Sequence, residues 1–546
     1  MLRSEIIRRI LERRGIGADQ LEDYLHPSLS CLAKPEELPG VCEAADVILA
    51  AVSGGKKVVV FGDYDCDGVC ATAIMMRTLE TLRASAEAFI PNRLDEGYGM
   101  SEKSVARLLR ENPDMGLLVT VDNGINSVDQ VAELKSRGLS VVITDHHLPG
   151  DELPKADAIV DPVVSAPERL SRLCGAGIAF LLANRVISEA RRRGLYAGSS
   201  VGGPMLVLAG LATVTDVMPL LGQNRILVAE ALRKFMSCAP MGLRELYSRA
   251  ARAGNKELTS KDFGFMLGPR INAAGRMASG LQALELVHSE DREITRELAR
   301  IVDEYNLQRK TIEQAMSEEA LAKVVPGAEA QVIDLPTGHQ GIAGIVAARV
   351  MEKLGNVVPV CVIAGGHGSA RSPEGLNIRD AFVACADVLE KFGGHAAAGG
   401  FSVKDGRIDE FREKLCAYCR RIRGEDLSTQ VQKTWRERVD AWVQPDELTM
   451  ELAEDAAQMA PFGEGNPEVV FGMKGVRFQD VKPIGQEGRH LSLSIGPTRV
   501  KAVWWNRGDL IEPLRTAGGA EHDVSFTLAI SDYGERHLEM RLVSID

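Results

Sequence analysis

The chain has 546 residues, which corresponds to about three to five domains, and its 45% hydrophobic and 26% charged residues are typical of a soluble globular protein. Its 64 basic and 76 acidic residues give a net charge of −12, which excludes a uniformly basic nucleic-acid coat but allows local basic patches. No apolar run is long enough for a membrane span, the N-terminus lacks the apolar core of an export signal, and the 10 cysteines are too sparse for a disulfide scaffold, so we expect a cytoplasmic protein with reduced thiols.

Residues 1–52 have a helical pattern that prolines interrupt, and residues 53–288 alternate short apolar runs with segments of helix length. Continuous Val- and Ile-rich runs separated by helices indicate βαβ units around a buried parallel sheet. A charged and then Gly/Ser-rich stretch at 191–204 is typical of a surface loop. We expect strands at 58–61, 88–90, 117–121, 141–144 and 158–160, with helices at 69–83, 101–112 and 126–138 between them.

The second half of the chain begins with residues 289–325, which contain neither Gly nor Pro and predict a connecting helix. Fully helical, this segment would be about 55 Å long. A second strand–helix region follows at 326–430, and residues 431–546 hold a linker and five strand-like runs, which favour a small β-barrel of the OB type. The predicted fold class is therefore α/β, with two α/β domains joined by a long helix and followed by a barrel.

Acidic residues and histidines follow the predicted strands of the first domain. The carboxyl ends of parallel strands meet at one edge of a sheet, so we expect these side chains to lie close together. In chain order they are Asp63, Asp65 and Asp67 of GDYDCDG, Asp122 of VDNG, the triplet Asp145, His146 and His147, and Asp161.

Such a cluster predicts a metal site. Two carboxylates about 4 Å apart repel by roughly 4 kcal/mol at an effective dielectric constant of 20, so several together need cations. Carboxylate and imidazole ligands suit Mn²⁺, Mg²⁺ or Zn²⁺, and two adjacent ions are a common device for phosphodiester hydrolysis. Taken singly, each feature has a plainer explanation, because Asp is a common turn former and an Asp after a strand can cap the next helix. Cys66 is expected to point into the fold, since a thiol ligand would favour softer ions.

The motifs named above carry a family resemblance. Together with TDVMPL around Asp216, they resemble the four motifs of the DHH phosphoesterase superfamily, and GSARS and GGHAAAGG resemble its associated second domain. The order of FGDYDCDG, IPNRLDEGYGM, GPRINAAGRM and MAPFGEGNPE is similar to RecJ-type single-strand-specific 5′-to-3′ DNA exonucleases over nearly the whole chain. The resemblance implies a DHH catalytic domain at 53–288, a DHH-associated substrate-binding domain at 326–430, and an OB-like nucleic-acid-binding domain within 431–546.

The resemblance also implies a centre of two divalent ions, with Mn²⁺ as the first choice and Mg²⁺ as the alternative. His147 is expected near the scissile phosphate, and Asp65, Asp122, His146 and His147 are the expected catalytic residues. Many superfamily members have a His where this chain has Phe61, and Asp63 is expected to compensate. The sheet pattern gives no signal for Asp216, which follows an apolar stretch of helical character. The implied metal ligands are Asp63, Asp65, Asp67, Asp122, which would bridge the ions, His146 and Asp216.

A polyanionic substrate also needs donors, and Arg offers a bidentate fork to phosphate oxygens. Glycine-rich turns let backbone amides approach phosphate closely. The sequence does not separate Arg270 from Arg276, which both lie in GPRINAAGR. The expected substrate-binding residues are Arg93, Arg270, Arg276, Ser369, Arg371 and His395.

The function expected from the resemblance is metal-dependent hydrolysis of single-stranded DNA from the 5′ end to mononucleotides, in DNA repair and recombination. Single-stranded DNA is the expected partner, with a single-strand-binding protein and a helicase as suggested protein partners. No GxxxxGK[ST] loop is present, which argues against ATP hydrolysis. Two alternatives stay open: a DHH phosphodiesterase for short oligoribonucleotides or cyclic dinucleotides, and a non-catalytic replication scaffold. The first typically lacks a C-terminal β module, and the second would lack metal ligands.

The C-terminal module is expected to hold single strands by stacking bases on aromatic side chains in a basic groove. Trp504 and Trp505 are adjacent, so in a strand they would point to opposite faces, and one could pack the core while the other meets DNA. The residues considered for this surface are Trp504, Trp505, Phe526, Tyr533, Lys482, Arg489, Arg499 and Lys501.

Overall fold

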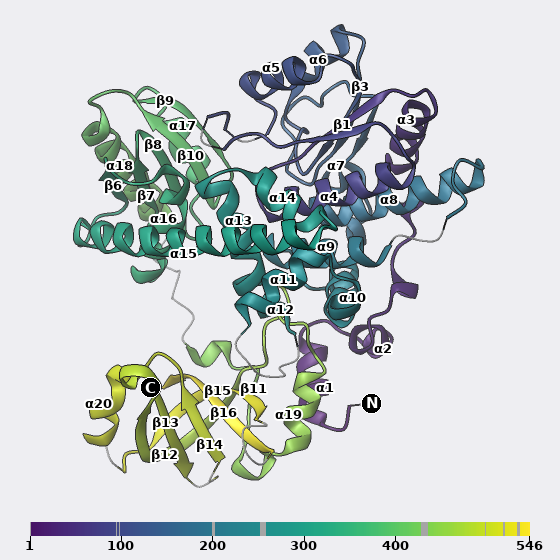
Figure 1. Cartoon of the computed structure of the whole chain (residues 1–546). Helices are drawn as coiled ribbons and strands as arrows, with labels where there is room; N and C mark the ends of the chain where they lie inside the picture. The colour runs from purple at the N-terminus through teal and green to yellow at the C-terminus, as the bar shows by residue number, and fades with distance from the viewer. Residues whose placement is uncertain are drawn as a thin grey trace.

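A computed structural model of the chain describes residues 2–93, 95–97, 99–198, 202–251, 258–426, 435–496, 498, 500–516, 519–531 and 536–545. Two α/β domains lie side by side, a long helix crosses from one to the other in the view of Figure 1, and a β-barrel lies below. No helix of the described residues is both long and apolar enough to cross a membrane. The predicted fold class, α/β with a C-terminal barrel, is confirmed.

The first domain is built on a five-stranded sheet in the order β2-β1-β3-β4-β5. All neighbouring strands are parallel, as the continuous runs of buried Val, Ile and Leu in β1, β3 and β4 predict. This arrangement brings the carboxyl ends of all the strands to one edge. The strands are β1 (Lys57–Phe61), β2 (Ala86–Phe89), β3 (Met115–Val121), β4 (Ser140–Thr144) and β5 (Ala158–Val160).

Helices cover both faces of this sheet. Val59 and Phe61 face a cluster with α5 (Glu102–Glu111) and α6 (Val128–Ser136). Val58 and Val60 point the other way, because side chains alternate along a strand. That second face packs against α3 (Val41–Ser53), α4 (Cys66–Thr81), α8 (Gly175–Arg192) and α9 (Gly202–Thr215).

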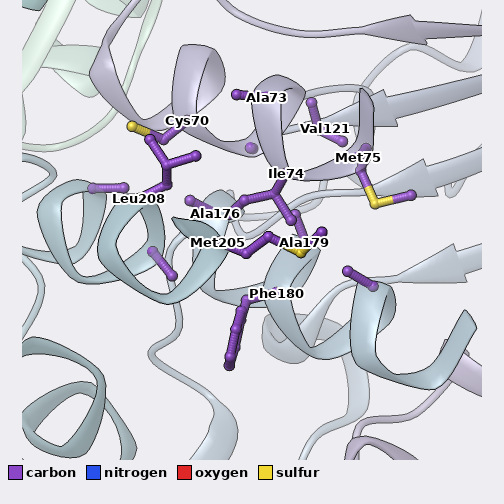
Figure 2. Packing of buried hydrophobic residues seen from close by; sticks show 14 of the residues in the cluster. Cys70, Ala73, Ile74, Met75, Val121, Ala176, Ala179, Phe180, Met205 and Leu208 are labelled. Atoms are coloured by element: carbon purple, nitrogen blue, oxygen red, sulfur yellow. The ribbon is translucent and has the colours of Figure 1, made fainter. Parts of the chain in front are cut away.

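Small side chains allow α4, α8 and α9 to approach one another closely. Figure 2 shows Ala73 of α4 and Ala176 and Ala179 of α8 among larger residues such as Ile74 and Met205. The expected surface loop at 191–204 is shorter than predicted, since α8 extends to Arg192 and α9 begins at Gly202. The domain continues with α10 (Gly222–Cys238), α11 (Met241–Ala250), α12 (Ser260–Asp262), the π-helical turn η4 (Phe263–Leu267), α13 (Gly268–Met277) and α14 (Gly280–His288).

The connecting helix α15 spans Arg292–Ala322 and leads into the second domain. The second sheet has the order β6-β7-β8-β10-β9, with β6 and β7 parallel and the remaining pairs antiparallel. Residues 378–392 divide between a short helix and a strand. The elements are β6 (Gln331–Leu335), α16 (Ala343–Lys353), β7 (Val360–Ala364), β8 (His367–Arg371), α17 (Ile378–Ala384), β9 (Leu389–Gly394), β10 (Ala398–Val403) and α18 (Ile408–Asp426).

The C-terminal barrel contains the five predicted strands and a short additional one, in the order β11-β12-β13-β14-β16-β15, and a β12–β15 pairing closes it. Trp504 is 3% exposed and Trp505 is 49% exposed, as their adjacency predicts. Phe526 is buried in the core, and Tyr533 and Arg499 lie outside the described residues. The elements are β11 (Ala441–Trp442), α19 (Met450–Ala457), β12 (Phe471–Ile484), β13 (His490–Gly496), β14 (Val500–Trp504), α20 (Ile511–Thr516), β15 (His522–Ser531) and β16 (His537–Ile545).

The N-terminal segment packs against two different units. The helices α1 (Glu5–Arg13) and α2 (Leu21–Leu25) share a buried cluster with the barrel, whereas α3 packs on the first sheet. The carboxylate of Asp455 in α19 accepts hydrogen bonds from the backbone N–H groups of Arg3 and Ser4, at 2.6 Å each. The start of the chain is therefore part of the barrel core.

Arg225 of α10 joins the first domain to both of these segments. Its buried guanidinium donates to the carbonyl oxygens of Tyr24 at 2.7 Å, Met459 at 3.0 Å and Ala460 at 2.7 Å. Burial lowers the pKa of this side chain. Because carbonyl oxygens from two segments satisfy a buried cation here, loss of either segment would leave that cation with fewer partners.

Candidate active site

The GDYDCDG loop is the first part of the site, and it directly follows β1. The carboxylate of Asp65 caps α4 by accepting from the N–H groups of Asp67 and Gly68, each at 3.0 Å. A Cβ atom on Gly68 would lie 2.5 Å from the backbone nitrogen of Asp63, so only glycine fits at that position. The loop therefore turns tightly, and its three acids stand together at the end of the strand.

Asp67 is held by the N-terminus of a second helix. Its two carboxylate oxygens accept from the N–H groups of Gly175 at 2.7 Å and Ala176 at 2.8 Å, in the first turn of α8. A helix N-terminus carries unpaired N–H groups and a partial positive charge, which stabilise a carboxylate. The α4–α8 packing thus fixes the orientation of this acid.

Asp122 follows β3 and is buried, with a φ angle of 63° in the left-handed region. Its neighbour Asn123 donates from Nδ2 to the carbonyl oxygens of Phe61 at 3.3 Å and Val121 at 2.9 Å, which ties this turn to the sheet. The turn directs the Asp122 carboxylate toward His146, whose Nε2 lies 3.0 Å from Asp122 Oδ1. Non-glycine residues in this conformation are uncommon, and they cluster at functional sites.

Asp145, His146 and His147 follow β4 and have distinct positions. Asp145 is buried, and its Oδ1 lies 2.7 Å from His147 Nδ1 while its Oδ2 accepts from the N–H of Ile125 at 2.9 Å. Burial by itself would raise the pKa of Asp145, but the hydrogen bond and charge of His147 lower it. Burial likewise favours a lower pKa for His147, yet the bond to Asp145 raises it above the usual value. Asp145 therefore orients His147 and favours its charged form.

Asp216 reaches the site from the end of α9, on the turn that includes Val217 with a φ of 56°. Its Oδ2 lies 3.7 Å from His146 Nε2. Burial, with the nearby charges of Asp67 and Asp65, raises the pKa of Asp216 to about 9. Proximity to these residues is a tertiary effect, so the sequence carries a signal for Asp216 only through the motif resemblance.

Three groups of side chains bring ligand atoms within 4.8 Å of one another. His146 and Asp122 each belong to two groups, so neighbouring ions could share them. His147 also belongs to one of these groups, although the sequence led us to expect it near the scissile phosphate and not among the metal ligands. The groups are Asp122, His146 and His147; Asp67, His146 and Asp216; and Asp63, Asp65 and Asp122.

The donor set fits divalent cations. Within the described parts of the chain, Asp63 Oδ1 and Asp216 Oδ2 are buried without a hydrogen-bond partner. Burial raises the pKa of Asp63, with a further increase from the charge of Asp65, and burial with Asp67 and Asp65 raises that of Asp122. Bound cations would satisfy these oxygens and remove the repulsion between them.

Three neighbouring positions lie outside these groups. Phe61, where the family resemblance led us to expect a His, points toward α5 and α6 and stacks on Phe89 with ring centroids 5.1 Å apart. Cys66 is buried in the hydrophobic cluster, as expected. Asp161 caps α7 (Pro162–Ser165) by accepting from the N–H of Val163 at 2.8 Å, the plainer role that the sequence left open.

Arginines face the acids from other elements, and we name Arg93, Arg276 and Arg371 the arginine cluster. Arg276 of α13 donates from Nη1 to the carbonyl oxygen of Gly341 at 2.9 Å, and burial together with the charge of Arg93 lowers its pKa to about 9. Burial and Arg93 also lower the pKa of Arg371, at the end of β8. Arg93 lies over the ring of Tyr64 at 4.8 Å. Within the described residues, none of the three forms an ion pair with a carboxylate.

The structure separates Arg270 from Arg276. Arg270 is about one turn and a half earlier on α13, where its Nε donates to Asp303 Oδ1 of α15 at 2.8 Å and its Nη1 donates to the carbonyl oxygen of Met266 at 2.8 Å. Its charge is thus neutralised inside the protein. The structure places Arg270 outside the arginine cluster, paired with Asp303.

Ser369 and His395 belong to the second domain. Ser369 lies two residues before Arg371 on β8, so both side chains point to the same face of the sheet. His395 lies in the turn between β9 and β10, and its ring is parallel to that of His147, with a centroid distance of 6.3 Å and an interplanar angle of 13°. This turn therefore brings the second domain to the histidine pair.

Asn272 is a site residue that the sequence reasoning missed. Its Oδ1 accepts from the N–H of Cys66 at 2.7 Å and so anchors the GDYDCDG loop to α13. Four residues later on the same helix, Arg276 belongs to the arginine cluster. Only the motif GPRINAAGRM, which contains both residues, could have pointed to it.

Comparisons with known proteins decide the family. The model of the DHH family N-terminal domain matches residues 57–200, that of the DHHA1 domain matches 328–421, and that of the RecJ OB domain matches 439–544. The single-stranded-DNA-specific exonuclease RecJ of Dickeya dadantii is 34% identical over 98% of this chain and 95% of its own length. The chain belongs to the RecJ family of single-stranded-DNA-specific exonucleases.

Other RecJ proteins support this assignment. The Bacillus subtilis RecJ is 31% identical over 97% of this chain, which spans 66% of that protein's length. The crystal structure of Thermus thermophilus RecJ in complex with Mn²⁺ matches 99% of this chain and 76% of its own, with a TM-score of 0.82 and 30% identity. Its structure in complex with Mg²⁺ matches with a TM-score of 0.76, 28% identity, and coverage of 99% and 74%.

Proposed function

We propose that this protein hydrolyses single-stranded DNA from the 5′ end to mononucleotides, at a centre of two divalent ions. The observation that carries the proposal is the juxtaposition of a cluster of acids and histidines with arginines that form no ion pair with a carboxylate within the described residues. Oxygen and nitrogen ligands without a thiolate suit Mn²⁺ or Mg²⁺, and RecJ of Thermus thermophilus has been crystallised with both. When bound, such ions supply Lewis-acid activation of water and stabilise charge on the phosphate.

The ligands in this proposal are the six expected residues. Asp122 and His146, which each belong to two of the ligand groups, are the candidates for shared positions. Burial lowers the pKa of His146, which favours the neutral imidazole that a metal requires. Asp63 takes the place of the His that other superfamily members carry at Phe61. The proposed ligands are Asp63, Asp65, Asp67, Asp122, His146 and Asp216.

The other residues bind and orient the substrate in this proposal. Arg276 and Arg371, with Ser369, bind the 5′-terminal phosphate through charge-assisted hydrogen bonds. His147 contacts the scissile phosphate through Nε2, since its Nδ1 lies 2.7 Å from Asp145. His395 stands beside His147 and closes the site from the second domain. A 5′ phosphate held on one side of the metals would set the polarity of digestion.

The barrel provides a second contact with DNA. Trp505 is exposed and packs edge-on against His490, at a centroid distance of 4.8 Å. An exposed aromatic ring on an OB barrel suits base stacking. The presence of this module favours a long single strand as the substrate. It argues against the alternative function, a phosphodiesterase for short oligoribonucleotides or cyclic dinucleotides.

A digestion time course tests the proposal. DNA strands labelled at either the 5′ or the 3′ end, and an RNA strand of the same sequence, are incubated with Mn²⁺, Mg²⁺ or chelator. We expect the 5′ label of the DNA to appear at once as a mononucleotide, the 3′ label to pass through a ladder of shortening strands, and the chelator to stop both. Immediate release of the 3′ label would overturn the polarity, and cleavage of the RNA strand at an equal rate would overturn the preference for DNA.

We also infer cooperation with a helicase and a single-strand-binding protein, in the cytoplasm of a bacterial cell. The sequence contains no GxxxxGK[ST] loop with which to hydrolyse ATP and separate a duplex. In this inference another protein therefore supplies the single strand. Duplex DNA should resist digestion until a helicase and ATP are added. Rapid digestion of a blunt duplex by this protein alone would contradict the inference.

A further inference from the structure

A groove of about 400 Å³ lies between the catalytic domain and the loop that leads into the barrel. One wall is the segment after Asp216, the second is the helical run that begins at Ser260, and the third is the loop at 462–468. The N–H of Leu220 donates to the carbonyl oxygen of Glu464 at 2.8 Å, which fixes the first wall to the third. The groove thus adjoins the proposed metal centre at one end and the barrel connection at the other.

Two apolar side chains of this groove are exposed. Phe265 is 80% exposed and Val217, the residue directly after Asp216, is 65% exposed. Burying a phenylalanine is strongly favourable, so a surface phenylalanine beside a second exposed apolar residue and a groove is informative. Phe265 also lies in the π-helical turn η4, and such turns occur frequently at functional sites.

A continuous helical run from α12 through η4 to α13 relates Phe265 to the two other parts of the site. Asn272 on this run holds the GDYDCDG loop at the N–H of Cys66, and Arg276 at its end belongs to the arginine cluster. At 1.5 Å per residue, Phe265 and Arg276 are about 16 Å apart along the axis, with the anchored metal loop between them. A strand with its 5′ phosphate at Arg276 and its first phosphodiester at the acids would continue toward Phe265.

We propose that Phe265, with Val217 beside it, stacks a base of the single strand downstream of the scissile bond, on the path from the metal centre to the barrel. This inference rests on the proposed exonuclease function and names a further substrate-binding residue. Base–aromatic stacking accepts every base, as a nuclease without sequence preference requires. The base must first leave a duplex stack, so the contact also favours single strands.

The charges of the groove fit a base better than a phosphate. Glu468 is paired with Lys261 at 2.7 Å, and Glu464 lines the same wall. Because Lys261 neutralises Glu468, Glu464 is the carboxylate of these two that would repel a phosphate, whereas an uncharged base meets no such repulsion. The strand therefore turns its base toward Phe265 and its phosphates toward solvent.

The first experiment compares Phe265→Ala and Phe265→Trp with the wild type on 5′-phosphorylated strands of increasing length. We expect Phe265→Ala to raise KM about five- to 150-fold on strands that reach the groove, with little change in kcat, because one stacked base is lost. The shortest strands should be unaffected, and Phe265→Trp should restore affinity. Leu307→Ala, at a 66% exposed position on α15, is the matched control and should leave KM unchanged.

The second experiment moves a single abasic position along the strand. In the wild type, one or two positions should weaken binding markedly, and in Phe265→Ala this dependence should disappear. Additive effects of the abasic position and the substitution at every site would overturn the proposal, as would an unchanged KM on all lengths. Hydrolysis of the same strands by the wild type tests the exonuclease function independently of Phe265. Thermal unfolding of each variant with and without Mn²⁺ identifies a folding defect.

Discussion

The two charged sides of the active site are built in opposite ways. The acidic side comes from one domain, where short loops after β1, β3 and β4 and the end of α9 bring its groups together. The basic side draws Arg93 from a loop, Arg276 from α13 and Arg371 from the second domain. On the acidic side burial raises pKa values, as for Asp216, to about 9, and on the basic side it lowers them, as for Arg276, also to about 9.

This difference has a common cause, because each side lacks the counter-charge that would make it stable alone. Buried charges are costly unless they are paired. The acids require cations and the arginines require an anion, and a metal-bound DNA end carries both. The site is therefore preorganised for its ligands at the expense of the unliganded protein, and this interpretation can be tested on either side.

The largest effect is expected on the acidic side, from Asp122→Asn. Asparagine tolerates the left-handed backbone at this position, so the fold should hold. Loss of a shared carboxylate should reduce kcat/KM about a thousandfold or more, since several kcal/mol of transition-state stabilisation depend on the ions. Removing one buried charge should keep or raise the metal-free melting temperature, while stabilisation by Mn²⁺ should shrink.

The control for Asp122→Asn is Asp151→Asn, which removes an exposed carboxylate of a loop. It should leave activity, melting temperature and the response to Mn²⁺ unchanged. Near-normal turnover of Asp122→Asn would rule out a shared metal ligand at this position.

On the basic side, Arg371→Ala should have a smaller effect. A charge-assisted hydrogen bond to phosphate contributes roughly 1.5–3 kcal/mol, so kcat/KM should fall about ten- to a hundredfold. The preference for a 5′-phosphorylated over a 5′-hydroxyl strand should narrow. Arg371→Lys retains the charge without the bidentate fork, so its kcat/KM should lie between those of the wild type and Arg371→Ala. Stabilisation by Mn²⁺ should not change. An unaltered ratio between the two strand ends would remove Arg371 from the phosphate site.

Asp145→Asn tests the positioning of His147. Loss of this orienting partner is expected to lower kcat about ten- to a hundredfold. The Asp145 carboxylate raises the pKa of His147, so the variant should lower that pKa and move the alkaline limb of the pH–rate profile to lower pH. A fall in kcat with an unmoved limb would indicate that Asp145 has only a structural role.

The last prediction concerns stability rather than activity, namely the pH dependence of stability without metal. The pKa of Asp216 is about 9 in the folded protein and near its usual low value in the unfolded chain. Between these values the folded state binds more protons, so stability should fall as the pH rises from about 4 to about 9. Mn²⁺ should remove most of this slope, and Asp216→Asn should reduce it. Differential scanning calorimetry with chelator or Mn²⁺ measures it, and rising stability across this range would contradict the burial of an uncompensated acid.

The sequence by itself determined the first sheet and most of the acidic side. Runs of Val and Ile predict the parallel strands, and in such a sheet carboxyl ends must meet, so Asp63, Asp122 and His146 could be expected together. Adjacency also predicted that Trp504 and Trp505 face opposite ways. These features depend on local periodicity and on a topological rule, both of which are written in short stretches of chain.

Only the tertiary structure decided the rest, because it depends on which distant elements touch. Asp216 reaches the acids through the packing of α9 on α4, and Arg270 differs from Arg276 because Asp303 of α15 neutralises it. The N-terminal helices complete the barrel core. Arg225 links α10 to two other segments through their backbone carbonyl oxygens, and the sequence cannot indicate such partners because every residue has a carbonyl. Phe265 is an ordinary apolar residue in the sequence, and only its exposure beside a groove distinguishes it. Side-chain partners and exposure follow from long-range packing, which no local pattern specifies.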